Sequence, residues 1–205
     1  LARLKRGLEH LDDAERVILS LARMVEAKDE NTEGHCERLS LLSVALGQHM
    51  GLDDRDLVAL DRGGVLHDIG KVGIPDSVLF KEGPLSAEEW EVMKQHPTIG
   101  EQVVAPLRTL QDVRPIVRHH HERWNGSGYP DGLAGEAIPL TARVLQVVDA
   151  YDALRTKRPY KRELTHVQAA SILHKEADQG LWDPRLLEIA LTLFQTYELP
   201  PGITW

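Results

Sequence analysis

Apolar residues at the start of the chain recur at the spacing of an amphipathic helix. They follow alternating steps of three and four residues, interrupted by Glu15: Leu4, Leu8, Leu11, Ile18, Ala22 and Val25. This pattern predicts one long helix over residues 1 to about 30. The helix could pack against its own domain, or it could be a signalling helix that joins an upstream domain and pairs with a second copy. About three heptads are a minimal coiled-coil signal, so the pattern leaves both interpretations open.

The remaining apolar segments are separated by signals that start and stop helices. Asp53 is a good N-cap for a helix running to Ile69, where Gly70 would end it. Two capping boxes and one N-cap before a proline mark further helix starts, at Ser86, Thr165 and Asp183. No strand-like alternation persists outside two Gly- and Pro-rich loops, 73–84 and 125–139. We therefore predict an all-α, multi-helix bundle preceded by the N-terminal helix.

Composition narrows the class of protein. The 205 residues are 42% apolar, which is enough for one sizeable domain, and the net charge of −8 argues against a general binder of nucleic-acid backbones. The single cysteine, Cys36, cannot form an internal disulfide and favours a cytoplasmic location. No signal peptide or membrane-length apolar run is present in this sequence. Because the chain starts at Leu1 without Met, we expect it to be part of a longer protein.

Several residues of the kinds that bind metals occur at predicted helices and their ends. The candidates are His35, His67, Asp68, His96, His120, His121 and Asp149. If they converge, five imidazoles and two carboxylates could hold two cations, with Asp68 giving one oxygen to each. This mixed N/O set suits iron, manganese, zinc or nickel better than magnesium or calcium. A histidine taken alone is more often a hydrogen-bonded or surface residue than a ligand, and this is the interpretation for His10, His49, His166 and His174. His119 points elsewhere on a helix.

At these residues the chain resembles the HD-GYP domain, a branch of the HD superfamily of metal-dependent phosphohydrolases. The matching motifs are Gly34-His35-Cys36-Glu37-Arg38, His67-Asp68-Ile69-Gly70-Lys71, His96-Pro97-Thr98-Ile99-Gly100, His120-His121-Glu122-Arg123-Trp124, Gly126-Ser127-Gly128-Tyr129-Pro130, Asp149-Ala150-Tyr151-Asp152 and Arg158-Pro159-Tyr160-Lys161. The resemblance implies a helical bundle around central metals and hydrolysis of cyclic di-GMP to pGpG, in some members onward to GMP. It places a signalling or linker helix at residues 1–25 and the HD-GYP phosphodiesterase domain at 26–205.

The resemblance also implies roles for individual residues. One metal would be held by His35, His67, Asp68 and Asp149, and the second by His96, His120 and His121 with Asp68 as the bridge. Lys71, Arg158 and Lys161 match phosphate-contact positions, and Tyr129 would line the substrate site. The Gly-Tyr-Pro loop is also implied as a docking surface for diguanylate cyclase domains. The cofactors would be two divalent metals, with iron or manganese favoured, and the upstream partner a receiver or sensor domain.

One departure from the family concerns a third metal. Some members place a glutamate four residues before the first ligand histidine, where this chain has Asn31. Because a neutral amide oxygen is a weaker ligand than a carboxylate, we expect two metals, and the second hydrolysis of pGpG to GMP is in doubt.

The residues also support a mechanism. Two cations can activate a bridging water and clamp a phosphodiester, while Lys71, three residues beyond Asp68, would stabilise the charge that develops. Arg158 can grip a phosphate bidentately, and Lys161 adds a point charge. Glu122 is expected to support a metal-binding histidine. Trp124 could stack on a guanine or belong to the core.

Other functions remain in competition. The chain could be another HD-type nucleotide phosphohydrolase, which a substrate panel would reveal. It could also be a non-catalytic sensor of cyclic di-GMP or a partner-docking module, although the intact ligand set argues against that interpretation.

Overall fold

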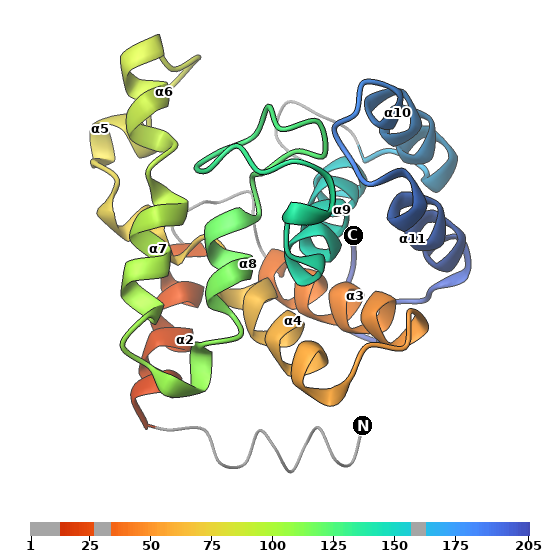
Figure 1. Ribbon diagram of the computed structural model, residues 1–205, viewed down its shortest axis with the longest axis horizontal. Coiled ribbons are helices and arrows are strands. Elements are labelled where there is room, and N and C mark those ends of the chain that lie inside the picture. The colour runs from red at the N-terminus through yellow and green to blue at the C-terminus, as the bar shows by residue number, and fades with distance from the viewer. Residues whose placement is uncertain (1–12, 27–33, 157–162) are drawn as a thin grey trace.

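The computed structural model describes residues 13–26, 34–156 and 163–205, and in them the chain is built from helices (Figure 1). The first half contributes α2 (Asp13–Glu26), α3 (His35–His49), α4 (Asp54–Leu66), η1 (Ile69–Gly73), α5 (Asp76–Leu79), α6 (Ala87–Met93) and α7 (His96–Val104). The second half contributes η2 (Arg108–Leu110), α8 (Arg114–His119), η3 (Gly135–Ala137), α9 (Leu140–Arg155), α10 (His166–Asp178) and α11 (Pro184–Thr196). The described part has no strand, and the all-α prediction is confirmed.

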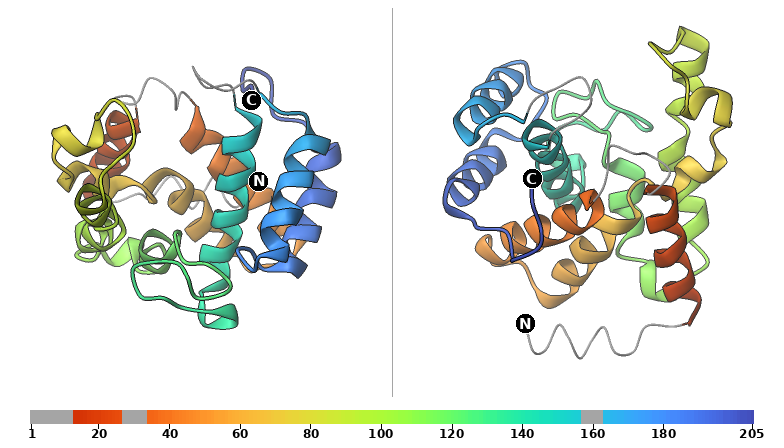
Figure 2. Two further views of the ribbon diagram at one scale, coloured as in Figure 1. Left: turned by 90° about the horizontal axis from the view of Figure 1, so that it is seen from above. Right: turned by 180° about the vertical axis from the view of Figure 1, so that it is seen from behind.

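Two hydrophobic clusters hold these helices together. The larger joins α3, α4 and α9 to α10 and α11, with fully buried side chains such as Leu39, Leu60 and Tyr151. The smaller joins α2, the end of α4, η1, α7 and α8, and includes Leu66 and Ile69. Figure 2 shows the same division, with α9, α10 and α11 on one side and α2, α5, α6 and α7 on the other. The segment connecting α4 to η1 therefore lies where both groups of helices meet.

Local signals in the sequence place most helix starts correctly. Ser86 and Thr165 each accept the backbone N–H three residues on, and the third-residue Glu or Gln returns the bond, so both capping boxes form. Asp53 caps α4 by accepting the N–H of Asp56, and Asp183 caps α11. These caps satisfy N–H groups that have no partner within their own helix.

The predicted end of the helix at Gly70 is wrong. α4 ends at Leu66, and residues 69–73 form the 3-10 helix η1. Gly70 serves a different purpose, because a Cβ atom added there would lie 1.9 Å from the carbonyl oxygen of His96. Only glycine lets η1 approach the start of α7 this closely, and this contact brings His96 next to Asp68.

The helix α2 packs against its own domain, as one of the two interpretations of the N-terminal pattern predicts. Ile18, Leu19 and Ala22 join the smaller hydrophobic cluster. Glu15, which interrupts the apolar stripe, is fully buried, and its Oε1 lies 2.7 Å from Nε of Arg62 on α4. An apparent break in the pattern is thus a buried ion pair. The parts of the predicted helix at 1–12 and 27–30 lie outside the described residues.

The helices α5 and α6 form an arm beyond the start of α7, beside the loop 121–134 (Figure 1). No side chain of α6 is buried. None of the helices in the described residues is long and apolar enough to cross a membrane.

Candidate metal centre

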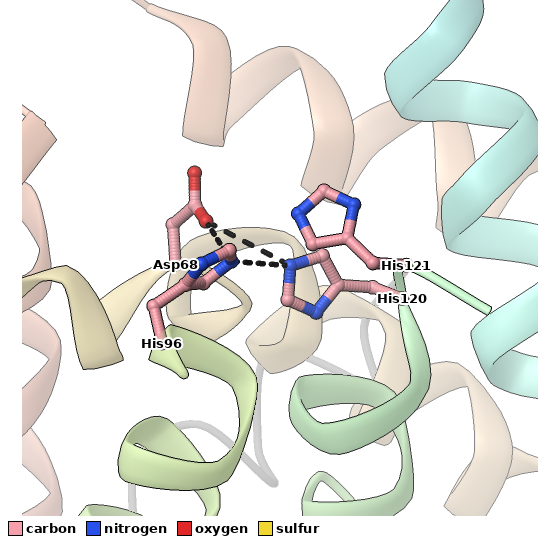
Figure 3. A group of neighbouring side chains, drawn as sticks. All are labelled: Asp68, His96, His120 and His121. Atoms are coloured by element: carbon pink, nitrogen blue, oxygen red, sulfur yellow. Dashed lines mark hydrogen bonds and ion pairs between the residues drawn. The ribbon is translucent and has the colours of Figure 1, made fainter. Parts of the chain in front are cut away.

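All seven candidate ligands come together in two groups. Asp68, His96, His120 and His121 form one, with ligand atoms within 4.8 Å of one another (Figure 3). His35, His67 and Asp149 form the other, by the same distance. This is the division that the resemblance implies.

Six of the seven ligands lie at or next to helix ends. His35 and His96 are the first residues of α3 and α7, His67 and Asp68 follow the last residue of α4, and the pair 120–121 follows α8. Asp149 comes from within α9. Helix ends from both hydrophobic clusters therefore meet at the site, and the buried residues on either side of His67-Asp68, Leu66 and Ile69, anchor the joint.

The carboxylate of Asp68 is divided between the two groups. Its Oδ1 lies 3.2 Å from Nε2 of His96 and 3.7 Å from Nε2 of His120. Its Oδ2 faces the other way and lies 3.4 Å from Nε2 of His67 and 2.6 Å from Nζ of Lys71. One carboxylate oxygen thus faces each group, as a bridging ligand requires.

Backbone carbonyls fix three of the imidazoles in one orientation. In each case Nδ1 of the histidine lies within hydrogen-bond distance of the backbone carbonyl three residues earlier. The distances are 3.1 Å from His67 to Gly64, 2.8 Å from His96 to Met93 and 2.8 Å from His120 to Val117. A carbonyl only accepts, so each Nδ1 must carry the proton. Nε2 of each ring is then unprotonated, which is the tautomer that a metal ligand needs, and Nε2 of His96 lies 3.3 Å from Nε2 of His120.

A carboxylate orients the fourth imidazole. Nδ1 of His35 lies 2.7 Å from Oδ2 of Asp152, while its Nε2 lies 3.6 Å from Asp149. Arg38 donates to both oxygens of Asp152, at 2.5 and 3.2 Å, and both residues are buried. Our sequence interpretation did not identify Asp152 as a positioning residue. The signal was its spacing from Asp149, because residues three apart lie on one face of a helix.

The electrostatics of the site favour neutral imidazoles at His120 and His121 beside an ionised Asp68. Burial lowers the pKa of His120 to about 4 and lowers that of His121 well below its usual value. Burial opposes ionisation of Asp68, but Lys71 and His67 outweigh it and hold the pKa of Asp68 well below its usual range. Burial also acts to lower the pKa of His67, but Asp68 outweighs it and the net shift is upward. Neutral imidazole and ionised carboxylate are the forms that bind cations.

The donor set therefore fits a pair of divalent cations. Imidazole nitrogens dominate, with one carboxylate between the groups and another at one side, which suits first-row transition metals better than magnesium or calcium. The residues that would hold them are the seven named above.

Tyr129 lies directly beside the metal-type ligands. Its ring stacks on His121 with centroids 4.9 Å apart, and its backbone N–H donates to the carbonyl of His121 at 3.2 Å. Gly128 allows this contact, because an added Cβ atom would lie 2.4 Å from the Cα atom of Glu122. The loop is thus folded back against the ligand pair. Arg158 and Lys161, the other predicted substrate contacts, and Asn31 lie outside the described residues.

The expected role of Glu122 behind a metal-binding histidine is wrong. Its buried carboxylate accepts the backbone N–H groups of Asp131 at 2.8 Å and Leu133 at 3.0 Å. It therefore shapes the loop that carries Tyr129. Trp124 is half-buried with Arg143 over its ring at 5.6 Å.

The histidines not expected to bind metal have other contacts. His119 lies 3.0 Å from Oδ2 of Asp131, and His174 lies 2.7 Å from Glu188. His166 bonds the hydroxyl of Tyr151 at 2.9 Å. His49 is exposed at the end of α3, and His10 lies outside the described residues.

Comparison with known proteins agrees with the geometry. The HD-domain family profile matches residues 20–186, and this chain belongs to that family. The resemblance to its HD-GYP branch is confirmed by the relatives. The chain is 41% identical over 192 residues to the cyclic di-GMP phosphodiesterase response regulator RpfG of Xanthomonas campestris, with 92% of this chain and 50% of that protein covered.

Two further proteins extend the comparison. The chain is 35% identical over 182 residues to the 3'3'-cGAMP-specific phosphodiesterase 2 of Vibrio cholerae. The match covers 88% of this chain and 35% of that protein. The solved structure of Bd1817, an HDG"Y"P protein from Bdellovibrio bacteriovorus, superposes with a TM-score of 0.64 at 26% identity, covering 89% of this chain and 61% of that one. The chain spans 50% of the length of RpfG and 35% of the length of the Vibrio phosphodiesterase.

Proposed function

We propose that this domain is a metal-dependent cyclic di-GMP phosphodiesterase that opens the cyclic dinucleotide to pGpG. The observation that carries the proposal is the divided carboxylate of Asp68, with one oxygen toward each group of imidazoles. Such a bridge is the feature expected of a two-metal hydrolase that acts on a phosphodiester. The comparisons support this reaction class, because the chain matches the HD-domain family and two of the named relatives are phosphodiesterases.

The site residues would hold two divalent cations, for which iron and manganese are the favoured identities. When bound, such cations supply Lewis acidity that lowers the pKa of water and offsets the charge of the phosphodiester. His35, His67 and Asp149 would hold one cation, and His96, His120 and His121 the other. Asp68 contributes to both.

The remaining residues act on the substrate. Lys71 is held by Asp68 at 2.6 Å, so its ammonium group lies at the edge of the ligand set, where it can neutralise charge that develops on a phosphate oxygen. Tyr129 contributes a ring beside His121, and burial raises the pKa of its phenol, which therefore stays protonated and can donate a hydrogen bond. Arg158 and Lys161 remain predicted phosphate contacts.

A second substrate is a specific alternative. One relative is a 3'3'-cGAMP-specific phosphodiesterase, and both compounds are cyclic dinucleotides with the same phosphodiester ring. A non-catalytic sensor remains a weaker alternative, because all seven candidate ligands are present and converge. Asn31 supports a two-metal site and pGpG as the end product.

Regulation forms a further part of the proposal. Four features stay predictions: a cytoplasmic location, an upstream receiver or sensor domain, docking of diguanylate cyclase domains on the Gly-Tyr-Pro loop, and the division of the chain at residue 25. The outward face of α2 supports pairing with a second copy, because Val17, Leu21 and Met24 are exposed at heptad spacing.

The test is anaerobic reconstitution with Fe(II) or Mn(II), followed by chromatography of the products from cyclic di-GMP and from 3'3'-cGAMP. We expect pGpG from cyclic di-GMP, and loss of both metal and turnover in Asp68→Ala. Turnover of 3'3'-cGAMP alone would assign the alternative substrate. Full turnover in Asp68→Ala would refute the two-metal proposal.

A further inference from the structure

The arm formed by α5 and α6 carries an exposed tryptophan that core packing does not explain. Trp90 keeps 46% of its surface exposed, and no side chain of α6 is buried. The helix is held instead by its capping box and by an ion pair between Lys81 and Glu89 at 2.5 Å. Trp90 stands four residues after the cap Ser86, where it can pack on Leu85 in a hydrophobic staple, yet nearly half of its surface stays exposed.

Trp90 is the outermost of three rings that lead away from the candidate metal centre. His121 belongs to one ligand group, and Tyr129 stacks on it with an interplanar angle of 27°. Trp90 meets Tyr129 edge to face, with ring centroids 6.4 Å apart at 77°. The arm (residues 76–93) and the loop (125–134) are separated in the sequence. The rings of Trp90 and Tyr129 bring them into contact.

We infer that Trp90 and Tyr129 form a stacking corner for one purine base of the substrate, an inference that rests on the proposed function. A cyclic dinucleotide places a purine next to each phosphodiester. Each base is joined to its phosphodiester through a ribose, so when a phosphate lies at the ligand groups a base can reach the rings that lead away from His121. Two rings nearly at right angles offer a planar base the face of one ring and the edge of the other.

Stacking of this kind has a recognisable effect on specificity. Every base has a π-face, so stacking on an aromatic side chain tolerates different bases, whereas hydrogen bonds to base edges do not. Stacking on Trp90 should therefore not distinguish guanine from adenine. It is a substrate-binding residue of the arm and takes no part in holding metal.

The experiment compares Trp90→Ala, Trp90→Phe and Phe80→Ala in the metal-loaded protein. Phe80 is a matched control, because it lies in the same arm and is 47% exposed. We expect Trp90→Ala to raise KM for cyclic di-GMP by roughly 5- to 150-fold, the range that corresponds to loss of one base stack. Metal content and kcat should stay near wild type, Trp90→Phe should recover most of the affinity, and Phe80→Ala should leave KM unchanged.

A binding measurement separates this inference from the proposed function. Cyclic di-GMP should quench tryptophan fluorescence in the wild type, and the quenching should be lost in Trp90→Phe. Absence of turnover in the wild type would refute the proposed function, while the fluorescence titration would still test the stacking corner. An unchanged KM in Trp90→Ala, or an equal increase in Phe80→Ala, would overturn the inference.

Discussion

Replacement of Asp152 by alanine should weaken metal binding without touching a ligand. The carboxylate orients His35 through Nδ1 at 2.7 Å and is itself held by Arg38. Without it, the ring of His35 loses both its orientation and its fixed tautomer. Groups that orient metal-binding histidines typically change affinity by about 10- to 100-fold when removed. We expect that loss for Mn(II), measured by competition with a chelator well below the unfolding temperature.

The same substitution should also destabilise the fold. Asp152 is 1% exposed, and its loss removes the carboxylate partner of the buried guanidinium of Arg38, which also donates to the carbonyl of Thr204 and the hydroxyl of Thr156. Breaking a buried pair costs about 3 to 5 kcal/mol, and these other acceptors favour the lower end. For a chain of this size, about 3 kcal/mol corresponds to a fall in Tm of roughly 6 to 12 °C.

A matched variant separates the two effects. Asp183 is also a buried carboxylate with an arginine partner, since it lies 2.7 Å from Nη1 of Arg143, and it caps α11. Asp183→Ala should lower Tm by a similar amount and leave metal affinity unchanged. The reasoning would be refuted if Asp152→Ala bound Mn(II) as tightly as wild type. It would also fail if Asp183→Ala weakened binding equally, because the effect would then follow from lost stability.

Three further substitutions test the close backbone contact at Gly70, the buried ion pair of Glu15 and the exposed face of α2. Gly70→Ala should abolish turnover and lower the metal content, because the added Cβ atom would displace the backbone of His96. A normal metal content in elemental analysis would contradict this prediction. Glu15→Ala should lower the free energy of unfolding by about 3 kcal/mol in urea titrations, since it leaves Arg62 without its carboxylate, and a loss under 1 kcal/mol would count against a real ion pair. Leu21→Glu should convert a dimer to a monomer in sedimentation experiments without loss of Tm, whereas an unchanged mass would exclude pairing through this face of α2.

The sequence was most informative where chemistry depends on residue type. Capping residues such as Ser86 act within one helical turn, so their partners are fixed by short spacing, and both predicted boxes form. The ligand set was identified from motifs, and the structure brings all of it together. The family resemblance therefore predicted that these ligands lie close together, which their spacing in the sequence alone could not do.

The sequence was least informative where a role depends on contacts between distant segments. Gly70 looks like an ordinary helix terminator, yet its function is close approach to a residue 26 positions later, His96. Glu122 sits next to ligand histidines in sequence, but its carboxylate turns to the loop nine and eleven residues on. Trp90 reads as a helix-start residue, and only the fold shows that it meets Tyr129.

The helix ends explain how three imidazoles of this site are held in place. The last four carbonyls of a helix lack intrahelical partners, and here three of these carbonyls belong to the ends of α4, α6 and α8: Gly64, Met93 and Val117. Each accepts the Nδ1 proton of the histidine three residues later, so the same interaction satisfies the helix and aims Nε2 at the site. The negative end of each helix dipole also lies toward the ligand groups and favours bound cations. The fold therefore fixes these three rings through its own backbone, whereas for His35, at the start of α3, the carboxylate of Asp152 takes the corresponding position at Nδ1.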